Sequence, residues 1–117
     1  MIGIVGLGYV GITSALCFHS LGEDIKGFDI DKKRINKLSK GDDLHVYDQK
    51  LNKYFKKNFC KISFSDNIDS MKDLEDVFIC VPTESKEGFL DLTIVKDVIS
   101  KLDNLNIKNI WIRSTID

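Results

Sequence analysis

Three glycines near the start of the chain have the spacing of a phosphate-binding turn. Gly6, Gly8 and Gly11 follow the apolar run 2–5 and precede an amphipathic stretch. Gly6 permits a tight turn, Gly8 lets the backbone approach a pyrophosphate, and Gly11 lets a helix lie close to a strand. The N–H groups and the dipole at the start of that helix attract phosphate charge. This pattern, between a strand and a helix, predicts a dinucleotide site.

Acidic and basic side chains beyond the glycines favour one cofactor. Asp29 closes a second apolar run, 25–29. A carboxylate at this position would accept hydrogen bonds from the adenosine ribose and would repel the 2′-phosphate of NADP. NAD is therefore the expected cofactor. Asp31 is a rival for this role, but it is better placed as the N-cap of a helix. Arg34 could reach the adenosine phosphate or ribose, and the alternative is a solvated arginine.

The elements that must position these residues alternate along the chain. Apolar runs predict strands, and apolar residues at helical spacing predict helices. Alternation of the two predicts an α/β fold, a Rossmann-type doubly wound parallel sheet with strand order 3-2-1-4-5 in three layers. The predicted strands are 2–5, 25–29, 62–64, 77–81 and 109–113, and the predicted helical segments are 10–21, 31–38, 47–59, 67–74 and 91–102.

Several local expectations follow from single residues. Gly22 is expected in a left-handed conformation at the end of the first helix. After Pro82 a polar loop is expected to run to Leu90, with Gly88 at its turn. Asp91 is then expected to cap the last helix, which turns apolar side chains inward. Those side chains are Leu92, Val95, Val98, Ile99 and Leu102.

Composition limits the classes of function. The 117 residues suggest one domain, and a formal net charge of −1 gives no reason to expect a nucleic acid or an anionic membrane as partner. No apolar run approaches the roughly 20 residues that cross a bilayer. The N-terminus reads as a strand and not as a signal peptide, so a cytoplasmic location is expected.

Cysteine and histidine residues predict neither a metal site nor a disulfide framework. The three cysteines are odd in number and far apart in sequence, and the two histidines have no partner at metal-ligand spacing. Cys17, in a helical pattern, and Cys80, in an apolar strand, are expected to be small buried hydrophobes. The surroundings of Cys60 predict nothing specific.

Beyond the glycines, longer motifs carry a resemblance to a known family. The segments 6–11 (GLGYVG) and 28–35 (FDIDKKRI) resemble the opening of the UDP-glucose/GDP-mannose dehydrogenase family. The segments 79–83 (ICVPT) and 113–115 (RST), with Gly88-x-x-Asp91-Leu92-Thr93 between them, fit the same family. The resemblance spans essentially the whole chain, with the motifs in the right order.

This resemblance implies a cofactor, a reaction and a set of site residues. The family oxidises the C6 hydroxyl of a nucleotide sugar to a carboxylate with NAD as the hydride acceptor. It implies that Asp29 and Arg34 hold the adenosine ribose, and that Thr83 and Thr115 line the pyrophosphate and nicotinamide side. The implied cofactor-binding residues are Gly6, Gly8, Tyr9, Val10, Gly11, Asp29, Arg34, Thr83 and Thr115.

The same comparison implies that residues 1–117 are the NAD-binding domain alone. The family's thiol nucleophile and proton-handling groups, its central helix and its sugar-binding domain correspond to chain beyond this region. No catalytic residue is therefore assigned. NAD(H) is the expected partner, a nucleotide sugar is expected only for a full-length enzyme, and an oligomer is possible. The residues that select among nucleotide sugars belong, by the same resemblance, to the family's sugar-binding domain.

Three departures from the family pattern concern the loops. Glu84 stands where the family usually has a second proline, the segment 44–48 lacks the family's usual Pro-Ile-x-Glu pattern, and the chain reads Ile116-Asp117 after the Arg-Ser-Thr motif. These differences concern the nicotinamide end and leave the pyrophosphate turn untouched.

Two other functions are compatible with the glycine pattern. One is a stand-alone nucleotide-binding or regulatory module, and the other is the N-terminal domain of a 3-hydroxyacyl-CoA or 6-phosphogluconate type dehydrogenase. The Val-Pro-Thr and Arg-Ser-Thr motifs fit the second alternative poorly.

Overall fold

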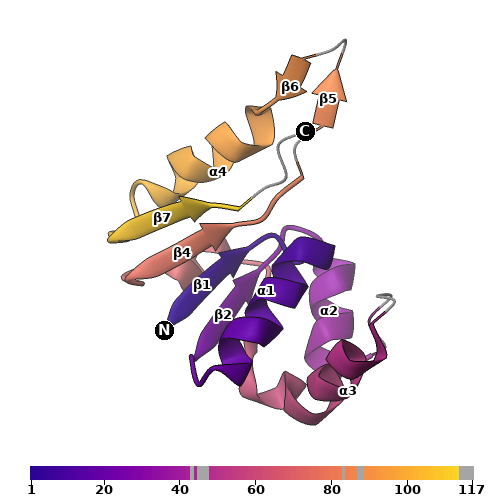
Figure 1. The fold of residues 1–117 in the computed structure, drawn as a ribbon. Helices are drawn as coiled ribbons and strands as arrows, with labels where there is room; N and C mark the ends of the chain where they lie inside the picture. The colour runs from indigo at the N-terminus through magenta and orange to yellow at the C-terminus, as the bar shows by residue number, and fades with distance from the viewer. Residues whose placement is uncertain (43, 45–47, 83, 87–88, 114–117) are drawn as a thin grey trace.

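Five parallel strands form one sheet at the centre of the molecule (Figure 1). The structure is a computed structural model that describes residues 1–42, 44, 48–82, 84–86 and 89–113. The sheet order is β3-β2-β1-β4-β7, which confirms the predicted order 3-2-1-4-5. Its strands are β1 (Ile2–Val5), β2 (Ile25–Phe28), β3 (Ser63–Ser65), β4 (Asp76–Ile79) and β7 (Asn109–Ile112).

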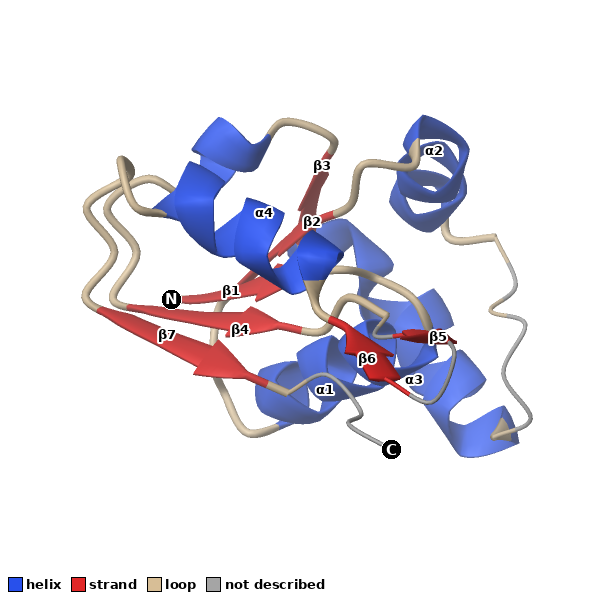
Figure 2. Cartoon of the chain, turned by 90° about the horizontal axis from the view of Figure 1, so that it is seen from above, coloured by secondary structure: helices blue, strands red, loops and turns tan. Residues whose placement is uncertain are grey.

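Helices cover both faces of the sheet and complete the three predicted layers (Figure 2). On one face α1 (Tyr9–Ser20), α2 (Lys32–Lys40) and α3 (Gln49–Asn58) bury a cluster that includes Leu16, Leu38 and Phe55. On the other face α4 (Thr93–Leu102) and the 3₁₀ turn η2 (Ile68–Met71) pack over Val77 and Ile79. A second 3₁₀ turn, η1 (Phe59–Lys61), follows α3.

None of the helices in the described part of the chain is long and apolar enough to cross a membrane.

Helix ends follow the residues that predicted them. Asp31 caps α2, because its carboxylate accepts hydrogen bonds from the N–H groups of Lys33 and Arg34. Gly41 ends α2 at φ 74°, and Gly22 follows α1 at φ 96° with its N–H bonded to the carbonyl of His19. Both glycines adopt the left-handed backbone conformation, which residues with a side chain rarely adopt.

The segment between β4 and α4 differs from the prediction. Instead of a loop, β5 (Glu84–Lys86) and β6 (Phe89–Asp91) form an antiparallel pair that projects away from the sheet (Figure 1). Pairing across this hairpin keeps residue 91 extended, so the helix N-cap falls on Leu92 and not on Asp91. Leu92 is therefore 37% exposed and does not turn inward. Gly88 lies outside the described residues.

One cysteine prediction is also wrong. Cys17 is exposed, whereas Cys80 is buried as expected. In α1 the buried face is formed by Ile12, Ala15 and Leu16, and each step along a helix turns the side chain by about 100°. One step beyond Leu16 therefore carries Cys17 off the buried face.

The turn between β1 and α1 brings two backbone segments close together. Gly6 has φ 94°, and a methyl group built on Gly11 would overlap the carbonyl oxygen of Gly6. A methyl group on Gly8 would meet nothing within 4 Å. Gly11 thus has no room for a side chain, whereas Gly8 leaves open space beside the turn.

We predict that Gly11→Ala lowers the free energy of unfolding by at least about 3 kcal/mol, because backbone must move to admit the methyl group. The better helix propensity of alanine, about 1 kcal/mol, does not offset this overlap. Urea unfolding followed by circular dichroism measures the loss. Gly8→Ala is the matched control and should cost less than about 1 kcal/mol, so equal losses in the two variants would refute the steric explanation.

Candidate dinucleotide-binding site

A cavity of about 920 Å³ opens at the carboxyl ends of the parallel strands. It lies where the chain order reverses between β1 and β4, the place at which open α/β sheets bind ligands. Its size is that of a small-molecule site. The lining residues are Val5, Gly6, Gly8, Tyr9, Val10, Phe28, Asp29, Ile30, Asp31, Lys32, Arg34, Asp66, Asn67, Ile68, Cys80, Val81, Pro82, Ile94, Asp97, Val98 and Lys101.

The N-terminus of α1 faces this cavity without a capping side chain. Its N-cap is Gly8, its first turn contains no acidic residue, and its first helical hydrogen bond runs from the Ile12 N–H to the Gly8 carbonyl at 2.9 Å. The N–H groups of Tyr9, Val10 and Gly11 precede that bond. By contrast, Asp31 and Asp48 cap α2 and α3. The start of α1 is therefore suited to an external anion.

Two other N–H groups of the glycine turn are held by the end of β2. The Gly6 N–H donates to the Phe28 carbonyl at 2.8 Å, and the Leu7 N–H donates to Oδ2 of Asp29 at 2.8 Å. The donors of the turn thus divide into two sets. One set ties the turn to β2, and the other is directed along the start of α1.

Asp29 is nearly buried, with 6% of its surface exposed, and it accepts three hydrogen bonds. Besides the Leu7 N–H, Nη1 of Arg34 donates to Oδ2 at 3.0 Å, and the Asp31 N–H donates to Oδ1 at 2.9 Å. Two carboxylate oxygens offer about four acceptor positions. The described residues use three, so room remains for about one donor from a ligand.

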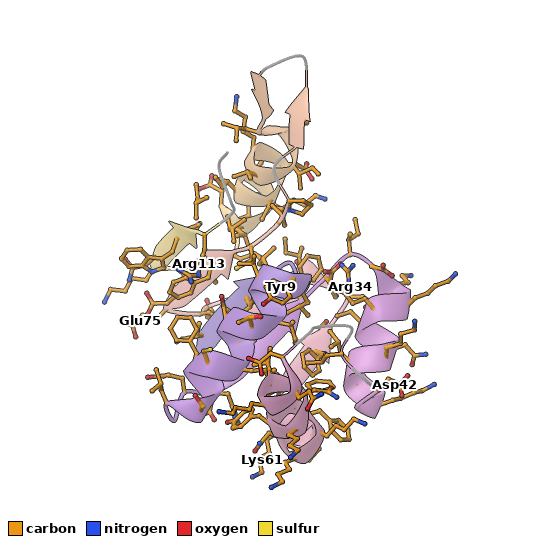
Figure 3. All side chains as sticks on the ribbon, turned by 45° about the vertical axis from the view of Figure 1, so that its right-hand side comes forward. Tyr9, Arg34, Asp42, Lys61, Glu75 and Arg113 are labelled. Carbon is orange, nitrogen blue, oxygen red and sulfur yellow. The ribbon has the colours of Figure 1, made fainter. Side chains whose placement is uncertain are left out.

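Arg34 and Tyr9 stand at neighbouring ends of α2 and α1 (Figure 3). The guanidinium of Arg34 is paired with Asp29, and its side chain is 45% exposed, so it is not a purely solvated arginine. Tyr9 is 61% exposed and Val10 is half-buried. The cavity therefore contains every predicted site residue that the structure describes except Gly11, which packs behind the turn against Gly6. Thr83 and Thr115 lie outside the described residues.

Cys80 follows β4 and forms part of the cavity wall. Burial raises the pKa of its thiol above the ordinary value, although the charge of Arg113 and a hydrogen bond with Ser14 act in the opposite direction. A thiol that remains protonated at neutral pH is a poor nucleophile. Cys80 is therefore suited to shaping the cavity and not to covalent chemistry.

Several cavity residues were not predicted from the sequence. Asn67 and Ile68 follow β3, while Val98 and Lys101 come from α4. A signal existed for the first pair, because residues after the carboxyl end of a parallel strand face the ligand edge. No signal marked the α4 residues. In the described ranges, no group of three or more His, Cys, Asp or Glu residues is arranged to hold a metal ion.

Comparison with known proteins places this geometry among dehydrogenases. The chain is 36% identical to the UDP-glucose 6-dehydrogenase of Rickettsia bellii over 98% of its length, and it covers 28% of that protein. It is 31% identical to an uncharacterized protein of Methanocaldococcus jannaschii, of which it covers 13%. The chain therefore spans less than a third of these relatives.

Solved structures agree on the fold. The UDP-D-ManNAc dehydrogenase of Pyrococcus horikoshii superposes with a TM-score of 0.86 at 28% identity. A ternary complex of the GDP-mannose dehydrogenase of Pseudomonas aeruginosa superposes with a TM-score of 0.85 at 26% identity. In both cases 98% of this chain matches 28% of the other.

The family model for the NAD-binding domain matches residues 1–117. The glycine turn, the uncapped start of α1 and the buried Asp29 all lie within that match. The chain belongs to the UDP-glucose/GDP-mannose dehydrogenase family, as its NAD-binding domain.

Proposed function

We propose that this chain binds NAD(H) in the cavity and serves as the cofactor-binding part of a nucleotide-sugar 6-dehydrogenase. The observation that carries the proposal is the start of α1, which opens at Gly8 with no capping side chain and no acid in its first turn. A helix N-terminus without a capping side chain or a nearby acid attracts a pyrophosphate when it lies where the strand order of a parallel sheet reverses.

The residues present fit the parts of a dinucleotide. The N–H groups of Tyr9, Val10 and Gly11 would hold the pyrophosphate, and open space beside Gly8 would admit it. The remaining acceptor position of Asp29, together with Arg34, would hold the adenosine ribose. From the family resemblance, Thr83 and Thr115 are proposed on the nicotinamide side. Bound NAD supplies the hydride acceptor for oxidation of an alcohol.

The charges at the adenosine end favour NAD over NADP. Asp29 and Asp31 both line the cavity beside the turn, and carboxylates there repel a 2′-phosphate. Lys32 and Arg34 also line this part of the cavity and could attract such a phosphate, but the guanidinium of Arg34 already pairs with Asp29. The domain is therefore proposed to discriminate by charge repulsion.

The oxidation itself is proposed to need a longer protein. Conversion of a hydroxyl to a carboxylate through a thiol intermediate requires a positioned base and an activated thiolate. Cys80 is buried with a raised pKa, and Cys17 and Cys60 do not line the cavity. The relatives named UDP-glucose 6-dehydrogenase, from Rickettsia bellii and Campylobacter jejuni, are more than three times as long as the region that matches this chain. The nucleotide sugar is thus proposed as the substrate of such a longer protein only.

We predict that NADH binds the purified chain with a dissociation constant below about 1 mM, and that NADPH binds at least about tenfold more weakly because of its additional phosphate. Titration followed by NADH fluorescence and by calorimetry measures both constants. Absence of NADH binding at millimolar concentration would refute the proposed function. Equal constants would refute the charge-repulsion argument alone.

We predict that Gly8→Ala weakens NADH binding by at least about tenfold, because the methyl group occupies the space through which the pyrophosphate approaches the backbone. The same titration measures the change. Lys61→Ala, at an exposed residue that does not line the cavity, is the control for binding. An unchanged affinity in Gly8→Ala would show that the cofactor does not approach the turn at this point.

We predict that the chain alone does not reduce NAD in the presence of UDP-glucose, because it holds no activated thiol in the cavity. Absorbance at the NADH band measures turnover, with a full-length UDP-glucose 6-dehydrogenase as positive control. Steady NADH production by the purified chain would contradict the proposal that the oxidation needs a longer protein.

A further inference from the structure

We infer that Asp29 positions the glycine turn for pyrophosphate binding, in addition to its proposed contact with the ribose. This inference rests on the proposed function and deepens it. One carboxylate would then serve both halves of the site, and its loss would impair phosphate binding by a ligand that contains no ribose.

The first support is the location of the Leu7 N–H. Leu7 lies between two glycines, is 3% exposed and donates its N–H to Oδ2 of Asp29 at 2.8 Å in a buried hydrogen bond. A buried N–H without an acceptor is costly, so this bond selects one orientation of the peptide group between Gly6 and Leu7. The orientation of that peptide group in turn helps to determine where the start of α1 points.

The second support is the way the rest of the turn is anchored. The Leu7 side chain belongs to the core cluster under α1 and packs over Gly27 of β2. The Gly6 N–H donates to the Phe28 carbonyl at 2.8 Å. The turn is thus attached to β2 and the residue after it at three neighbouring points. Of the two hydrogen bonds among them, the one to Asp29 has a side-chain acceptor and can therefore be removed by substitution.

The third support is that Asp29 is itself held in place. The Asp31 N–H donates to Oδ1 at 2.9 Å, and Nη1 of Arg34 donates to Oδ2 at 3.0 Å. Three donors therefore converge on the two carboxylate oxygens. An asparagine at position 29 offers one acceptor oxygen and one NH₂ group, so its NH₂ must face a donor in either orientation.

The test compares Asp29→Asn with Asp31→Asn. Asp31 lines the same cavity, and its carboxylate caps α2 without an observed hydrogen bond to the turn. Asparagine caps a helix about as well as aspartate, so Asp31→Asn makes the same chemical change while leaving the turn intact. Both proteins are labelled with ¹⁵N, and amide hydrogen exchange at Leu7 is measured without ligand. We expect exchange at Leu7 to accelerate at least about tenfold in Asp29→Asn only.

Binding of two fragments then separates the roles of Asp29. Adenosine contains the ribose without phosphate, and inorganic pyrophosphate contains the phosphates without ribose. Chemical-shift titrations should show weaker binding of both fragments in Asp29→Asn. In Asp31→Asn, which also removes a carboxylate from the cavity wall, pyrophosphate binding should be no weaker than in the wild type. Unchanged pyrophosphate binding in Asp29→Asn would overturn the inference and leave a contact with ribose alone.

Two measurements keep the inference testable if Asp29→Asn does not fold. A scalar coupling between the Leu7 amide nitrogen and the Asp29 carboxylate carbon in the wild-type chain tests the hydrogen bond directly, and its absence would overturn the inference. Arg34→Gln removes the cation but leaves the Leu7–Asp29 bond, so amide exchange at Leu7 should change by less than about twofold. An acceleration like that expected for Asp29→Asn would show that the cation, and not the bond to Asp29, holds the turn, and would overturn the positioning role.

If wild-type NADH binding is absent while Leu7 exchange responds as expected, the proposed function fails and the structural coupling stands. If NADH binds and Leu7 exchange is unchanged in Asp29→Asn, the coupling fails and the proposed function stands.

Discussion

The close approach of Gly11 to the Gly6 carbonyl oxygen is the contact on which the rest of the structure depends. It brings the first turn of α1 against the end of β1, with no side chain between them. Because β1 is the central strand and pairs with both β2 and β4, this contact also sets where the helix start lies relative to the other strand ends. The cavity forms around that start, and its walls come from α4 and from the segments that follow β2, β3 and β4.

The hydrogen-bonding groups near the turn are divided between protein and ligand. Groups that face β2 are used within the protein, as the Gly6 and Leu7 N–H groups show. Among the described residues, none supplies a capping side chain to the N–H groups at the start of α1. The same division holds for Asp29, which uses most of its acceptor positions internally. A site built in this way is preorganised, since its backbone is held by contacts that exist before the cofactor binds.

The central strands β1 and β4 were predictable because buried parallel strands are continuous apolar runs. The runs 2–5 and 77–81 coincide with β1 and β4 to within two residues, and the segment 25–29, with Ile25 and Phe28, coincides with β2 to within one. The Asp31 cap followed from its place before a helical pattern. The hairpin of β5 and β6 was not predicted, because strands of three residues are too short for an alternating pattern to be recognised in the sequence. The exposure of Cys17 was missed because a one-residue step decides which side of a helix is buried.

The sequence by itself determined the fold class, the family and the position of the phosphate-binding turn, because these depend on residue types at short spacing. Glycines where no side chain fits and an acid after a strand are local signals. Only the tertiary structure decided how the carboxylate of Asp29 is used. Leu7 is far from Asp29 along the chain, and the two meet because β1 and β2 pair in parallel with Val5 opposite Phe28. A hydrogen bond between such segments depends on strand register, which no local pattern contains.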